Sequence, residues 1–342
     1  MQEFIKQVAR GKKRAQDLSY EDARRAAEMI CSGEADDAQT AALLVAERLK
    51  EESPDEAVAF AEVLREHTTH IPVIEEVQAR MIDFGGPYTG RNMFAQTIPS
   101  ALLLAAEGIP VYLHSGEALP PKYAVPLKHI VSDIGIDTGA PPEQIGRSLE
   151  EAGIGFGDTE KLCPPLQRIR RVRELIGVRT FLNTIEKMLS PAGARSIMVG
   201  IFHRTVVDTN SELLRRLGFD HMYMVQGAEG SEDLPAHRKS FLYHVTQEET
   251  ISFDLNPDDT GIGIRRNKEL ETLTLPEQTE LIEGVLRGNG HPDAHALTVY
   301  NTGVRYFLFG HRPTVDEGIQ LAESQLSAGA GWDQLEKWRK IQ

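Results

Sequence analysis

Apolar positions recur with helical spacing through the first seventy residues, between clear helix start signals. Ser19 is a good N-cap, and the helix that it begins is expected to end near Gly33, since glycine commonly follows the last helical turn. Asp36 or Asp37 caps a second helix, and Ser53 caps a third with proline and acidic residues in its first turn. The pattern predicts a small helical domain over residues 1–72, in which nothing looks catalytic.

From residue 81 the pattern changes to short apolar runs that alternate with helices. The run Met81–Phe84 ends at Gly85 and Gly86, a helix is expected over residues 97–106, and a second strand over 109–113. This is one βαβ unit, and the turn after its first strand is where an α/β sheet usually holds an anion. The alternative is a glycine turn that only reverses the chain.

The alternation continues to the end of the chain and predicts an α/β domain over residues 73–342. Strands are expected at 196–201 and 221–226 and a hairpin at 240–255, with helices between them and three more closing the chain. Helical pieces at 170–176 and 180–189 belong to a stretch, about 163–189, that we expect to pack back onto the helical domain. The fold class is therefore α/β, with a central, mainly parallel sheet flanked by helices.

Composition limits the function classes. The chain has 342 residues, 41% of them hydrophobic, with no apolar run long enough to span a bilayer and no secretory leader pattern at its start. Its two cysteines, Cys31 and Cys163, have no metal-ligand spacing, so we expect a protein of the reducing cytoplasm. Because no apolar run is long enough to span a bilayer, we also expect no association with a membrane. The net charge of −14 argues against general nucleic-acid binding.

The charge is unevenly distributed, because residues 163–204 carry a net charge of +6. A basic segment of this kind is either a solvated helix face or the lining of a cleft for a phosphorylated ligand. Its basic residues are Arg168, Arg170, Arg171, Arg173, Arg179, Lys187, Arg195 and Arg204.

Several motifs in this order resemble the anthranilate phosphoribosyltransferase family over essentially the whole chain. They are SGEADDAQTAALLVAERLKEESPDEAVAF, GIPVYLHSG, LIGVRTFLNTIEKMLSP, GAEGSED and VDEGIQLAESQLSAGAGWDQLEKW. The resemblance implies a helical domain packed on an α/β domain, with phosphoribosyl diphosphate and Mg²⁺ bound between them. It also implies a homodimer formed through the helical domain.

The family's diphosphate-binding turn corresponds here to DFGGPYTG, residues 83–90, which departs from the family pattern. Gly85 and Gly86 remain, whereas Pro87 has no N–H to offer a phosphate. The resemblance implies that Gly85, Gly86 and Thr89 contact a phosphorylated ligand, with either Arg91 or Tyr88 replacing lost backbone contacts.

Other family positions imply further ligand contacts. His114 matches the histidine after the second strand, and Lys122 is the remainder of a later phosphate-binding motif. Arg173 lies where the family grips the acceptor's carboxylate, with Arg170 and Arg171 as possible substitutes. Arg179 begins an Arg-Thr-x-x-Asn pattern that serves either binding or packing.

The family's metal-binding carboxylates correspond to Glu232 and Asp233, in swapped order. Adjacent carboxylates on a turn can hold Mg²⁺ that bridges to a diphosphate. The same pair is also common as a solvated acidic turn.

Two hypotheses follow. The departures resemble those of a divergent group within the family that lacks the diphosphate signature and includes nucleic-acid-binding proteins. On this interpretation the chain binds a phosphorylated ligand, single-stranded or duplex nucleic acid included, and is not an efficient anthranilate phosphoribosyltransferase. The alternative is Mg²⁺-dependent phosphoribosyl transfer from phosphoribosyl diphosphate to anthranilate or another aromatic amine or base. No single residue is assigned as catalytic.

Overall fold

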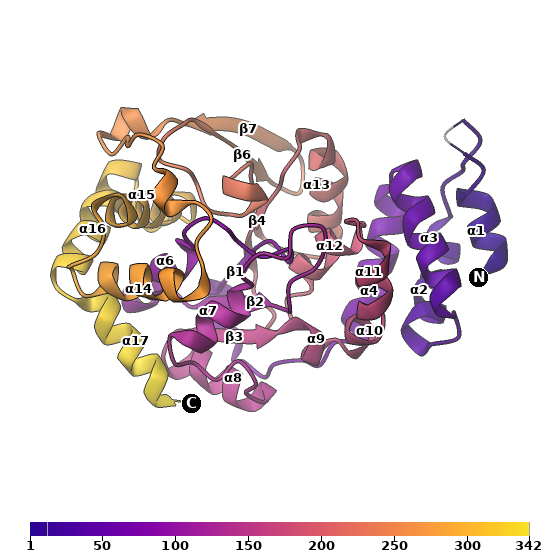
Figure 1. The fold of residues 1–342 in the computed structure, drawn as a ribbon, viewed down its shortest axis with the longest axis horizontal. Helices are drawn as coiled ribbons and strands as arrows, with labels where there is room; N and C mark the ends of the chain where they lie inside the picture. Colours follow the sequence, from indigo (N-terminus) through magenta and orange to yellow (C-terminus); the bar gives the residue numbers. More distant parts are fainter. Residues whose placement is uncertain (12, 342) are drawn as a thin grey trace.

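The computed structural model describes residues 1–11 and 13–341, with a bundle of N-terminal helices beside a larger α/β unit (Figure 1). The Ser19 side chain accepts a hydrogen bond from the Asp22 amide, while Asp36 and Ser53 each form a capping box. The helix starts predicted from the sequence are therefore confirmed. The helices of the bundle are α1 (Gln2–Val8), α2 (Tyr20–Ser32), α3 (Asp37–Lys50) and α4 (Pro54–Glu66).

A seven-stranded sheet in the order β3-β2-β1-β4-β5-β6-β7 forms the centre of the α/β unit. The first five strands are parallel, and β6 and β7 form an antiparallel hairpin at one edge. This arrangement confirms the predicted α/β class with a mainly parallel sheet. The strands are β1 (Ile82–Gly85), β2 (Val111–Ser115), β3 (Ile154–Asp158), β4 (Ser196–Gly200), β5 (His221–Val225), β6 (Ser240–Val245) and β7 (Thr250–Leu255).

The edge strand β3 was not expected from the sequence, because two of its five residues are glycines, which disfavour strands. Tertiary packing explains them. A Cβ at Gly157 would lie 2.1 Å from the Tyr112 hydroxyl, and a Cβ at Gly155 would lie 2.8 Å from Leu149 Cγ. The glycines let neighbouring side chains close over the strand.

The largest core lies on one face of the sheet, where α7 (Leu127–Asp133) and several longer helices pack (Figure 1). The longer helices are α6 (Thr97–Ala106), α14 (Leu275–Leu286), α15 (Pro292–Leu308), α16 (Val315–Ser327) and α17 (Ala330–Ile341). No described helix is both long enough and apolar enough to cross a membrane.

The remaining elements are short. The helices are α5 (Glu75–Arg80), α8 (Pro142–Glu151), α9 (Thr159–Leu162), α10 (Pro164–Arg168), α11 (Arg170–Ile176), α12 (Leu182–Ile185) and α13 (Val207–Arg216). The 3₁₀ turns are η1 (Glu186–Met188), η2 (Arg204–Val206), η3 (Ala228–Gly230), η4 (Pro257–Thr260) and η5 (Lys268–Leu270).

A second core joins the N-terminal helices to α10–α13 and to the opposite face of β4 and β5. Within it the Phe60 and Phe181 rings meet edge to face at 4.9 Å. Arg168 donates hydrogen bonds to the Ile30 and Cys31 carbonyls at the end of α2. The segment between α10 and η1 therefore connects the helical bundle to the sheet, as Figure 1 shows.

Candidate functional site

A cleft of about 850 Å³ lies between the helical bundle and the sheet. Residues 48–52 at the end of α3 form one wall. The other wall consists of residues 87–89 after β1, residues within 179–188, and residues within 200–210 after β4. Ligands of open α/β sheets bind beside the carboxyl ends of the strands. The cleft is therefore the candidate site.

Other side chains of the protein fill the space beside the turn after β1. A Cβ at Gly85 would lie 2.5 Å from Val199 Cγ1, and one at Gly86 would lie 2.7 Å from a terminal nitrogen of Arg91. The Gly86 amide already donates to the Phe84 carbonyl at 3.1 Å. Both glycines thus make room for neighbouring side chains, and the expectation that they contact a phosphorylated ligand stays a prediction.

His114 is buried and lies behind this turn. Its Nδ1 is 2.6 Å from the Tyr88 hydroxyl, and its Nε2 is 2.9 Å from Asp83 Oδ1. The Tyr88 hydroxyl also donates to the Glu186 carbonyl at 3.2 Å. Both nitrogens of the imidazole face protein groups, so His114 positions the turn and does not reach the cleft.

Glu232 and Asp233 were expected to hold a metal ion, and Arg91 a phosphate. In the structure all three are buried together. Arg91 places one terminal nitrogen 2.6 Å from Glu232 Oε1 and the other 2.6 Å from Asp233 Oδ2. Burial opposes ionisation of Glu232, but the Arg91 charge and the Thr97 hydroxyl hold the pKa of this carboxyl below its usual value.

This pair does not fit a resident magnesium ion, because the Arg91 guanidinium already occupies one oxygen of each carboxylate and Arg305 bonds the other Asp233 oxygen. The described residues contain no group of three or more histidine, cysteine or acidic side chains arranged for a metal.

In the described part of the chain, four of the eight basic residues of this segment have acidic partners, namely Arg170, Arg171, Arg173 and Arg195. Arg173 is 3% exposed, and its terminal nitrogens lie 2.7 and 2.8 Å from the two Glu186 carboxylate oxygens. Arg170 pairs with Glu160 at 2.6 Å and with Glu174 at 3.0 Å. Neither Arg170 nor Arg173 lines the large cleft, and the prediction that they contact a ligand stays a prediction.

Two further predicted contacts lie outside the cleft lining. Arg171 is exposed on α11, 3.6 Å from Glu174. Lys122 pairs with Glu229 at 2.5 Å and donates to the Gly90 carbonyl at 3.1 Å. Burial lowers the pKa of Lys122. Its ammonium group holds the loop against the turn.

Arg179 and Thr89, by contrast, do line the cleft. An Arg179 terminal nitrogen donates to the Thr89 hydroxyl at 3.3 Å, and its guanidinium lies 5.6 Å from the centre of the Phe202 ring. Phe202 is 52% exposed although it is a large apolar residue. The cleft therefore offers a cation beside an open aromatic face.

Two of the residues in this lining, Lys187 and Phe202, were not selected from the sequence as site residues. The Lys187 ammonium donates to the Gly200 carbonyl at 2.7 Å, and burial lowers its pKa to about 8. Phe202 follows directly after β4, and its position at a strand end was the available signal.

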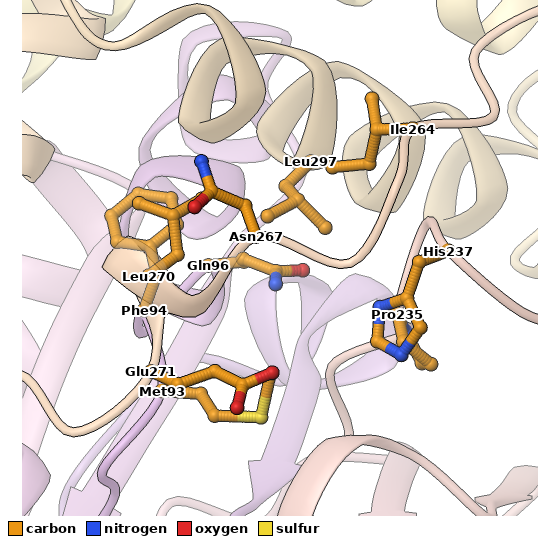
Figure 2. Close-up of a pocket in the computed structure, with 10 residues that line it drawn as sticks. All are labelled: Met93, Phe94, Gln96, Pro235, His237, Ile264, Asn267, Leu270, Glu271 and Leu297. Carbon is orange, nitrogen blue, oxygen red and sulfur yellow. The ribbon is translucent and has the colours of Figure 1, made fainter.

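A smaller pocket of about 20 Å³ lies beside the loop that precedes α6 (Figure 2). Met93, Gln96 and His237 are among its lining residues, and the Gln96 amide oxygen accepts a hydrogen bond from Asn301. Such a volume holds about one water molecule. We therefore take the large cleft, and not this pocket, as the candidate site for an organic ligand.

Two family descriptions match the chain. Residues 2–68 match the helical bundle domain of a glycosyl transferase family, and residues 84–332 match the a/b domain of the same family.

Curated relatives cover nearly the whole chain. Anthranilate phosphoribosyltransferase of Verminephrobacter eiseniae is 29% identical over 310 residues, covering 90% of this chain and 89% of the relative. The same enzyme of Chromobacterium violaceum is 27% identical over 322 residues, covering 94% and 93%.

Solved structures agree. Anthranilate phosphoribosyltransferase from Thermus thermophilus superposes with a TM-score of 0.83 at 25% identity, covering 99% of this chain and 98% of that chain. The Saccharomyces cerevisiae enzyme in complex with PRPP and Mg has a TM-score of 0.86 at 16% identity, covering 99% and 97%, and shows the shared fold. The two domain matches establish that the chain belongs to this glycosyl transferase family, and the relatives and solved structures that it resembles over nearly its whole length are anthranilate phosphoribosyltransferases.

Proposed function

We propose that the cleft between the helical bundle and the sheet binds a phosphoribosyl compound and that the chain transfers the phosphoribosyl group to an aromatic amine or base. The observation that carries this proposal is the pair of cations in the cleft. Among the described residues, neither Arg179 nor Lys187 forms an ion pair with a carboxylate, and both line the cleft. Unpaired cations in a concave polar site favour a phosphorylated ligand.

The relatives supply the first ligand to test, since the yeast enzyme was solved with PRPP and Mg. We propose phosphoribosyl diphosphate for this chain, with Mg²⁺ entering as the counterion of its diphosphate. The Arg91–Glu232–Asp233 contacts leave no place for a second ion resident on that pair.

Displacement at the ribosyl carbon releases diphosphate, so the site must stabilise developing negative charge and orient the incoming amine. Arg179 and Lys187 are the groups that would stabilise the leaving diphosphate here. Since Pro87 offers no N–H and Arg91 is engaged by carboxylates, we expect transfer to anthranilate to be slow compared with an ordinary biosynthetic enzyme.

Calorimetric titration with phosphoribosyl diphosphate and Mg²⁺ tests binding, and loss of anthranilate fluorescence tests transfer. Arg179→Ala is expected to weaken binding roughly tenfold, the usual size for loss of one charged hydrogen-bond donor. Arg171→Ala, an exposed arginine outside the cleft, is the matched control. No heat of binding by the unmodified protein at millimolar ligand would contradict the proposal.

A second candidate function, nucleic-acid binding, is favoured by the open Phe202 ring beside Arg179. Aromatic rings and cations together bind single strands by stacking and phosphate contact. The net charge of −14 opposes this function. Fluorescence polarisation with single-stranded and duplex oligonucleotides at two salt concentrations tests it, and only salt-dependent binding that falls in Phe202→Ala supports it.

We also propose a homodimer formed through the helical bundle. Leu175, on α11 beside α3 of the bundle, is 67% exposed and does not line the cleft. Large exposed apolar side chains favour association. Light scattering of the protein and of Leu175→Ser measures its mass in solution, and a monomer at high concentration would contradict the proposal.

A further inference from the structure

The carboxylates of Glu232 and Asp233 already have a cation between them. The Arg91 guanidinium contacts one oxygen of each at 2.6 Å, and Arg305 of α15 lies 2.9 Å from Asp233 Oδ1. The Thr97 hydroxyl bonds the same pair from the start of α6. All five side chains are buried, at 3% exposure or less.

The charges of this cluster balance. Two carboxylates face two guanidinium groups, and Arg305 also lies 4.8 Å from the centre of the Phe84 ring. A divalent ion added to this cluster would leave a buried excess of positive charge, which is costly without water. Glu232 Oε2 has no hydrogen-bond partner in the described structure, but it is buried and has no accessible surface for the waters that complete the octahedral shell of Mg²⁺.

The main chain of Arg91 is held in place by pairing with Val125. Its amide donates to the Val125 carbonyl at 2.8 Å, and its carbonyl accepts from the Val125 amide at 3.2 Å. Gly86 leaves the space that the guanidinium fills, because a Cβ there would lie 2.7 Å from it. Gly86 therefore accommodates the Arg91 side chain.

We propose that Arg91 is a resident cation that replaces a divalent metal ion at the Glu232–Asp233 pair, so that this pair binds no metal in the native protein. The carboxylates then keep their geometry at any metal concentration, and a phosphorylated ligand must bring its own metal ion. The inference does not rest on the proposed function, since it concerns the protein without ligand.

The test uses Mn²⁺ alone, followed by electron paramagnetic resonance, together with thermal unfolding in Mg²⁺ at constant ionic strength. We expect the unmodified protein to show no Mn²⁺ binding that depends on Glu232 and no change in Tm with Mg²⁺. Removing the cation with Arg91→Met is expected to create a metal site. About 10 mM Mg²⁺ should then raise the Tm of R91M by about 2 °C or more.

Arg171→Met removes an exposed arginine that pairs with the single carboxylate of Glu174, and it serves as the matched control with no metal response expected. Two results would overturn the inference: Mn²⁺ binding by the unmodified protein that is lost in Glu232→Gln, or a folded R91M without a metal response. If R91M does not fold, the measurement on the unmodified protein and Glu232→Gln still decides the question. Since no phosphoribosyl compound is present, failure here is distinct from failure of the proposed function.

Discussion

Tyr88 and His114 are joined by a hydrogen bond of 2.6 Å between the tyrosine hydroxyl and Nδ1 of the imidazole. The same hydroxyl contacts Thr159 and the Glu186 carbonyl, while the other side of the imidazole faces Asp83. The turn after β1 is thereby tied to β2 and to the segment that supports the helical bundle. Its shape is set by the protein and does not depend on a ligand.

Tyr88→Phe is expected to destabilise the protein by about 1–3 kcal/mol, because it leaves buried polar partners of the hydroxyl unsatisfied. Chemical denaturation measures the change in the free energy of unfolding. Tyr123→Phe, in which the tyrosine is 56% exposed, is the control and should be nearly neutral. A stable Tyr88→Phe with weakened ligand binding would instead assign the hydroxyl to the ligand.

The buried Arg173–Glu186 pair gives a second prediction. Arg173→Met is expected to cost about 3–5 kcal/mol, since it leaves the Glu186 carboxylate buried and unpaired. Adding Glu186→Gln to this variant should restore part of the loss. A double-mutant cycle from denaturation curves measures the coupling, and additive effects would show that the pair contributes nothing.

Glu47 gives a pH dependence. It is 1% exposed near Glu56 and Lys50, and burial together with the Glu56 charge raises its pKa from 4.5 to about 8. The folded protein thus holds this proton more tightly than the unfolded chain. The stabilisation of the folded protein by the proton on Glu47 is complete below pH 4.5. It is lost as the pH rises through 8, at up to about 1.4 kcal/mol per pH unit.

Glu47→Gln should therefore flatten the decline in the free energy of unfolding between about pH 5 and 8. The exposed Glu34→Gln in the same domain should leave the decline unchanged. Denaturation at a series of pH values measures both, and identical slopes for Glu47→Gln and the unmodified protein would refute the assignment.

Lys187 gives a prediction about how ligand affinity depends on pH. Because burial lowers its pKa to about 8, its charge is lost as the pH rises through that value. The affinity of the cleft for a phosphorylated ligand should fall between about pH 7 and 9. Lys187→Arg keeps its charge and should reduce this fall, as titration calorimetry across the pH range would show. A pH-independent affinity would exclude Lys187 from the ligand contacts.

Local patterns were sufficient for much of the architecture. The caps at Ser19, Asp36 and Ser53, and the βαβ unit around Gly85, depend on neighbours within a few residues, which the sequence displays directly. The alternation of strands and helices then implied the parallel sheet. The strand β3 was not predicted because it contains glycines, which are needed there so that side chains from other elements can pack closely against it.

The tertiary structure decides which charged side chains stay available for a ligand. Arg91 meets Glu232, 141 positions away, and Arg173 meets Glu186 across a turn between two short helices. Lys187 and Phe202 reach the cleft because the segments that carry them close over the ends of β1 and β4. The sequence does not show whether a charged side chain is paired or free. Pairing depends on distances between side chains, and these are set only when the strands and helices pack.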